Sequence, residues 1–75
     1  MLKAVEKLIR DANNGKKSAK YGNHRMEQTA DKIKYYYYWT CICEADKHTN
    51  KVKYDASYDS SSTTRAVNSY RQYYN

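Results

Sequence analysis

The sequence predicts a small α+β domain of order α-β-β-β-α, with two helices on a three-stranded antiparallel sheet. Apolar residues recur at helical spacing near both ends of the chain. Between them lies an aromatic run, Tyr35 to Cys43, whose Tyr, Trp and Cys side chains suit a pleated, half-buried surface. Strict polar–apolar alternation from Lys51 to Ala56 predicts a further strand. With 75 residues, the chain has room for one domain over residues 1–75.

The two helices are predicted over residues 2–12 and 62–74. The first ends at Asn13-Asn14-Gly15, a typical C-terminal stop, and its apolar face is Leu2, Val5, Leu8, Ile9 and Ala12. Before the second helix, the tract Ser60 to Thr64 is expected to supply a hydroxyl that caps the helix, in preference to a phosphorylation site. The apolar face of this helix is Ala66, Val67, Tyr70, Tyr73 and Tyr74.

The sheet is predicted from the middle of the chain. Gly22-Asn23 indicates a turn, and His24 to Thr29 a short strand. The central strand is expected from Ile33 to Glu44, and a polar loop at 46–50 joins it to the strand Lys51 to Ala56 as a hairpin. We expect Val52, Tyr54 and Ala56 to face inward.

Positive charge is concentrated in the first half of the chain. The formal net charge is +6, of which residues 1–34 carry +5. A cluster without acidic residues, formed by Lys16, Lys17, Lys20 and Arg25, predicts a contact with phosphate or with an acidic protein surface. A solvated loop is the alternative explanation of the same cluster.

No pattern in the sequence indicates an enzyme, a metal or a cofactor. His24 and His48 lie in predicted turns or loops without an adjacent nucleophile, and no Gly-rich phosphate loop is present. Cys41 and Cys43 would project from one strand face about 6.6 Å apart, a poor disulfide geometry that predicts reduced thiols. A metal site formed by both Cys and both His is the less favoured alternative. Without a secretory signal or a membrane-spanning stretch, we expect a cytoplasmic protein.

Three segments resemble a family of small uncharacterised proteins from phages and other mobile elements of low-GC bacteria. They are Asn14–Gly22, Tyr36–Cys43 and Tyr58–Arg65, within a similarity that covers about residues 14–74. In that family, N-G-x-x-S-x-Y-G precedes Y-x-Y-x-T-x-I-A, and Y-S-x-T-T-x-R-H precedes a final helix. This chain differs at Trp39, where a small residue is usual, and at Ala66, where His is usual. The resemblance implies a phage-type origin and no enzyme activity, and it assigns no functional residue.

The aromatic run would place large side chains on both faces of its strand. Composition favours burial of the set Ile33, Tyr35, Tyr37, Trp39, Cys41 and Cys43, whereas the family pattern favours Tyr36, Tyr38, Thr40 and Ile42. Either choice leaves two or three aromatic residues outside the helix-covered core, which predicts an interaction surface. Coverage of these residues by the terminal segments is the alternative.

Two functions are therefore expected. The favoured one is a phage-type accessory protein that docks on a host protein handling nucleic acid, as an anti-CRISPR-like factor would. The alternative is direct nucleic-acid binding through the basic 16–25 loop and the sheet aromatics. The sequence leaves a homodimer open. The predicted partner-binding residues are Lys16, Lys17, Lys20, Arg25, Tyr35, Tyr37 and Trp39.

Overall fold

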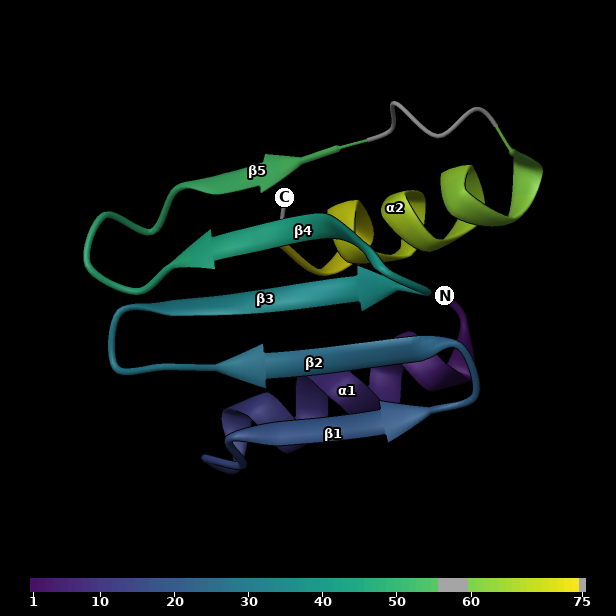
Figure 1. Cartoon of the computed structure of the whole chain (residues 1–75). Helices are drawn as coiled ribbons and strands as arrows, with labels where there is room; N and C mark the ends of the chain where they lie inside the picture. The colour runs from purple at the N-terminus through teal and green to yellow at the C-terminus, as the bar shows by residue number, and fades with distance from the viewer. Residues whose placement is uncertain (56–59, 75) are drawn as a thin grey trace.

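A five-stranded antiparallel sheet lies against two helices in the computed structural model, which describes residues 1–55 and 60–74 (Figure 1). The helices are α1 (Lys3–Asn13) and α2 (Ser61–Tyr74). The strands are β1 (Ser18–Tyr21), β2 (His24–Gln28), β3 (Lys32–Tyr37), β4 (Thr40–Asp46) and β5 (Val52–Tyr54). Strand order follows chain order, so the sheet is a meander. The predicted α+β class with two helices is confirmed, but the prediction of three strands is wrong.

The aromatic run accounts for one of the two extra strands. It was predicted as one strand from Ile33 to Glu44, but the chain reverses at Tyr38-Trp39, and Tyr37 pairs with Thr40 across the hairpin. The hairpin lets β3 and β4 satisfy one another's backbone groups, which a single strand of that length would leave to other partners. The other extra strand, β1, pairs with the predicted His24 strand across the Gly22-Asn23 turn.

Both helices begin and end within one residue of their predicted bounds. Val5, Leu8 and Ile9 of α1 are buried, as expected. Ser60 Oγ accepts a hydrogen bond from the Thr63 amide at 3.2 Å, which confirms the predicted hydroxyl cap. In α2, the predicted apolar face is buried at Ala66, Val67 and Tyr70. Near the end of the helix the Tyr73 side chain is 46% exposed. Of the predicted inward residues of β5, Ala56 lies outside the described residues.

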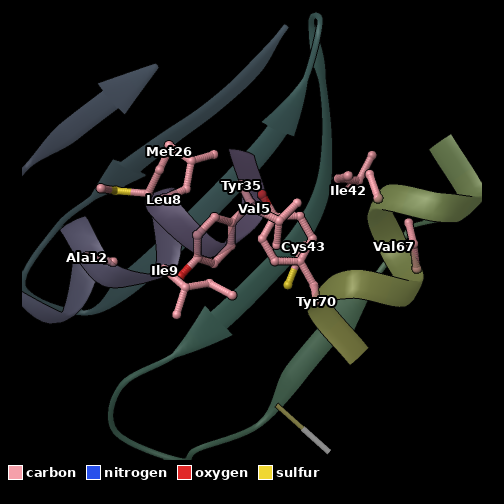
Figure 2. Close-up of a cluster of buried hydrophobic side chains, with 11 residues drawn as sticks. Val5, Leu8, Ile9, Ala12, Met26, Tyr35, Ile42, Cys43, Val67 and Tyr70 are labelled. Atoms are coloured by element: carbon pink, nitrogen blue, oxygen red, sulfur yellow. The ribbon is translucent and has the colours of Figure 1, made fainter. Parts of the chain in front are cut away.

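The core lies between the helices and one face of the sheet (Figure 2). The rings of Tyr35 from β3 and Tyr70 from α2 are fully buried and stack with their centroids 4.4 Å apart. The hydroxyls of Tyr35 and Tyr74 share a hydrogen bond of 2.6 Å. Aromatic rings therefore fill the centre that Leu or Phe occupies in other small domains. Other buried core residues are Val5, Leu8, Ile9, Ala12, Met26, Ile42, Cys43, Ala66 and Val67.

A β-bulge in β4 changes the expected direction of the cysteine side chains. Tyr35 pairs with Cys43 but Tyr36 pairs with Cys41, so Ile42 is an extra residue between them. Ile42 and Cys43 are buried in the core, and Cys41 lies with Tyr36 on the opposite face. The prediction that both cysteines share one face is therefore wrong, because the bulge interrupts the alternation on which it rests. Both residues are free thiols.

The helices leave the other face of the sheet uncovered, and we call it the open face. Its residues include Lys20, Arg25, Glu27, Lys34, Tyr36, Cys41, Glu44 and Lys53, which alternate with the core-facing positions. Neither helix is both long enough and apolar enough to cross a membrane.

Candidate docking site at the aromatic tip

The β3–β4 turn presents two large aromatic side chains, Tyr38 and Trp39, which we call the aromatic tip. The Trp39 side chain is 86% exposed and the Tyr38 side chain 55%. Among the described residues, Trp39 is the most exposed large hydrophobic residue. An indole exposed to water does not contribute the favourable free energy of apolar burial. This turn therefore stands out as a candidate interaction site.

Hydrogen bonds hold the tip in one conformation. Tyr38 has a φ of 55°, in the left-handed region that costs a non-glycine residue about 1–2 kcal/mol. The Tyr38 amide donates to the Asn23 carbonyl at 2.9 Å, and Asn23 Nδ2 donates to the Tyr38 hydroxyl at 2.9 Å. The Tyr38 ring also contacts the Tyr37 ring edge-on, with centroids 4.7 Å apart. These contacts tie Tyr38 to the neighbouring β1–β2 turn, so the backbone that presents Trp39 is preorganised for binding.

A groove of ≈ 480 Å³ lies beside the tip on the helix side of the sheet. One wall is built by Tyr37, Tyr38, Trp39, Thr40 and Ile42 of the hairpin, and the other by Ser60, Ser62 and Thr63 at the start of α2. Among residues 1–55 and 60–74, the residues that line the groove are aromatic, aliphatic or hydroxyl-bearing, and none of them carries a charge at neutral pH. The groove is therefore suited to an uncharged group.

On the open face, the row of residues nearest the tip carries two cations. Lys20, Arg25, Tyr36 and Cys41 follow one another across β1 to β4, and we call them the tip row. The Arg25 guanidinium stacks over the Tyr36 ring, 4.4 Å from its centroid, and lies 3.7 Å from a carboxylate oxygen of Glu27. Across β1 to β4 this row contains no carboxylate, and Asp55, just after β5, donates its amide to the Ile42 carbonyl beside Cys41 at 3.0 Å.

Carboxylates balance the cations farther from the tip. The next row across the sheet is Ser18, Glu27, Lys34, Glu44 and Lys53. Glu44 lies 3.4 Å from the Lys32 ammonium and 4.0 Å from that of Lys34. Away from the tip, the open face thus has the mixed charge of an ordinary solvated surface.

The structure separates the seven predicted partner-binding residues into four groups. Lys16 and Lys17 lie at the far end of β1, where Lys16 pairs with the buried Asp11 carboxylate at 3.6 Å. Lys20 and Arg25 lie in the tip row, and Trp39 forms the tip. Tyr37 is half-buried beside the groove. Tyr35 is fully buried beneath the helices, so its prediction as a partner-binding residue is wrong.

Asp11 and Tyr38 are two residues that sequence reasoning missed. Asp11 accepts a hydrogen bond from the Tyr21 hydroxyl, and this bond, with help from Lys16, holds the pKa of the Asp11 carboxyl below its ordinary value. The only available signal was the position of Asp11 beside the apolar stripe of α1. Tyr38 could have been found only by locating the turn within the aromatic run.

The four residues of the alternative metal site lie apart. His24 is on the helix-covered face, where its ring lies 4.9 Å from that of Tyr37 and burial lowers its pKa. His48 lies at the opposite end of the sheet from the tip, 2.7 Å from Asp31. The two thiols lie on opposite faces, and burial raises the pKa of both, that of Cys43 to about 12. Within residues 1–55 and 60–74, no three His, Cys, Asp or Glu side chains gather as metal ligands would.

Comparison with protein-family models, with curated proteins and with solved structures found no match to this chain. The resemblance to small phage proteins therefore stays a prediction.

Proposed function

We propose that this chain is a non-enzymatic binding module that docks on a partner protein through its aromatic tip. The observation that carries the proposal is Trp39, 86% exposed on a two-residue turn whose conformation is fixed by Asn23. Trp and Tyr are the residues that most often dominate protein interfaces, and they do so from rigid positions near the centre of the contact. Because the backbone of the turn is already ordered, binding loses little backbone entropy.

The resemblance to phage accessory proteins supports a host protein that handles nucleic acid as the partner, and an inhibitory or modulating role in the manner of an anti-CRISPR factor. A net charge of +6 does not suit a protein that imitates the polyanion such a host protein binds. We therefore propose docking beside the nucleic-acid path or on a regulatory surface. Recognition then depends on one aromatic anchor.

Direct nucleic-acid binding is the second candidate, and the tip row favours it. Lys20 and Arg25 could neutralise phosphates while Tyr36 or Trp39 stacks on a base. In that case affinity would fall steeply with salt, by about 0.7 to 0.9 in log K per phosphate contact for each unit of log salt. Docking on a protein predicts a much weaker dependence.

Capture from a bacterial lysate tests the proposed function. Tagged wild-type protein, Trp39→Ala and Tyr73→Ala would each be incubated with nuclease-treated lysate, and bound proteins would be identified by mass spectrometry. Tyr73 is the matched control, because it is an exposed aromatic residue on α2. We expect one partner to be retained by wild type and Tyr73→Ala and lost with Trp39→Ala. Capture that needs intact nucleic acid, or that is equal for all three proteins, would contradict the proposal.

A further inference from the structure

The like-charged pair Lys20 and Arg25 has a physical cost that the fold alone does not explain. The two residues are directly opposite in the β1–β2 register. Like charges in such cross-strand pairs are destabilising. Arg25 is partly compensated by Tyr36 and by Glu27, but no carboxylate of the described residues lies within ion-pair distance of Lys20. An arriving anion would relieve this repulsion.

The aromatic tip lies between two surfaces of different chemistry. On the open face its neighbour is the tip row with its two cations, and on the helix side its neighbour is the uncharged groove. A charged group entering the groove would lose water without gaining a counter-charge from the described lining residues, whereas an apolar side chain would cover the exposed Trp39 ring. A ligand that satisfies both surfaces therefore carries negative charge and an apolar group side by side.

We propose that the tip binds an acidic segment of the partner protein that carries one large apolar side chain. Carboxylates of that segment contact Lys20 and Arg25, and the apolar side chain lies in the groove against Trp39. This inference rests on the proposed function and adds to it the chemistry of the partner surface.

The distribution of charge on the open face favours an acidic peptide over a polynucleotide. Across β1 to β4 the tip row lacks a carboxylate, whereas Glu27 and Glu44 occupy the row directly behind it. A nucleic-acid strand long enough to be held firmly would extend over those carboxylates and be repelled by them. A short acidic segment needs only the tip row.

The test uses Trp39 as its reporter, because it is the only Trp of the chain. A random library of short displayed peptides would be selected on the wild-type protein, and the enriched peptides would be synthesised and titrated while Trp39 emission is recorded. We expect enriched peptides to combine Asp or Glu with one large apolar residue, and to shift the emission to shorter wavelength as the indole becomes covered. Replacing their acidic residues by Asn and Gln should lower affinity by at least about tenfold.

Two charge-reversed proteins provide the matched comparison. The double variant Lys20→Glu with Arg25→Glu should lose at least about tenfold in affinity for the selected peptides. The control, Lys17→Glu with Lys51→Glu, makes the same change in net charge at exposed positions away from the tip, and should change affinity by no more than about twofold. Far-UV circular dichroism would verify that both variants are folded.

The experiment distinguishes failure of this inference from failure of the proposed function. Enriched peptides that require Trp39 but lack acidic residues, or that bind both charge variants equally, would overturn this inference and leave the proposed function standing. If no peptide depends on Trp39, and oligothymidine or phosphatidylserine vesicles shift the emission instead, then both the inference and the proposed function are wrong.

Discussion

Tyr35 and Trp39 are four positions apart in one aromatic run, yet their environments are opposite. Tyr35 is fully buried between β3 and α2, whereas the Trp39 side chain is 86% exposed at the turn. Composition alone would bury both residues. The difference arises because the chain reverses at Tyr38, so that Tyr35, before the turn, faces the helices and the turn itself extends beyond them. The location of a turn therefore determines which aromatic residues stabilise the fold and which are available for binding.

Truncation of one aromatic residue in each region should lower stability only in the buried one. Tyr70→Ala removes a ring that stacks on Tyr35 in the core, and should lower the free energy of unfolding by about 3–5 kcal/mol. Trp39→Ala should change it by less than about 0.5 kcal/mol, because the side chain is exposed. Urea unfolding followed by far-UV circular dichroism measures both.

A loss of that size approaches the whole stability of a small domain. If Tyr70→Ala is unfolded without urea, Tyr70→Leu keeps most of the apolar volume and should remain folded with a smaller loss. A Trp39→Ala protein that is destabilised as much as Tyr70→Leu would contradict the separation of the two regions.

Two buried tyrosine hydroxyls of the core should differ in what they contribute to stability. The Tyr35 hydroxyl is bonded to that of Tyr74, but the buried Tyr70 hydroxyl has no hydrogen-bond partner among the described residues. Tyr35→Phe should therefore cost about 1 kcal/mol of unfolding free energy, and Tyr70→Phe should be neutral or stabilising. Equal losses in the two variants, measured by urea unfolding, would show that Tyr70 has a partner after all.

Acid should destabilise the protein through His24, a residue of the covered face. Burial lowers the pKa of His24 below its ordinary value of 6.5, so the unfolded chain binds the proton more tightly than the folded one. The contribution of neutral His24 to folding stability is fully present above pH 6.5. It is lost as the pH falls from there through the lower pKa of the folded state. Melting temperatures between pH 8 and pH 5 should fall for wild type and for the exposed control His48→Gln. His24→Gln should flatten this decline, and an unchanged slope would contradict the assignment.

The two thiols distinguish the faces of the sheet without perturbing stability. Cys41 lies partly exposed on the open face, and Cys43 is buried with a pKa raised by burial to about 12. A thiol-specific reagent at pH 8 should modify Cys41 in the folded protein and Cys43 only after unfolding, because the thiolate is the reactive form. Peptide mapping by mass spectrometry identifies the modified residue. Faster labelling of Cys43 would place the bulge elsewhere.

Sequence periodicity predicted the helices well and the sheet only in part. The apolar stripe of α1 and the alternation at Val52 and Tyr54 identify their elements, because burial on one face imposes the period. The β3–β4 turn was missed because Tyr38 and Trp39 are not turn-forming residues, and the left-handed conformation at Tyr38 is held by Asn23, which is distant in sequence. Strand β1 was missed because its Ser and Lys residues suggested a basic loop.

For the candidate site, too, the sequence identified individual residues but not their arrangement in space. Trp39 was identified from the sequence because the aromatic run has large side chains on both faces of its strand, and Lys20 and Arg25 because they belong to a cluster of cations. Their proximity was not predictable, since it depends on the register of β1, β2 and β3. The bulge at Ile42 also determines which thiol faces the core, and no local sequence pattern predicts this bulge.

The two-residue turn has an evolutionary consequence. Its flanking pair, Tyr37 and Thr40, closes the hairpin, and the exposed Trp39 is not part of the core, so position 39 is under little selection for stability. Substitutions at position 39 should therefore accumulate without the stability losses that usually limit adaptation of a binding surface. A lineage of such proteins could follow changes in its partner by exchanging one side chain, while Asn23 and the tyrosine core keep the scaffold constant.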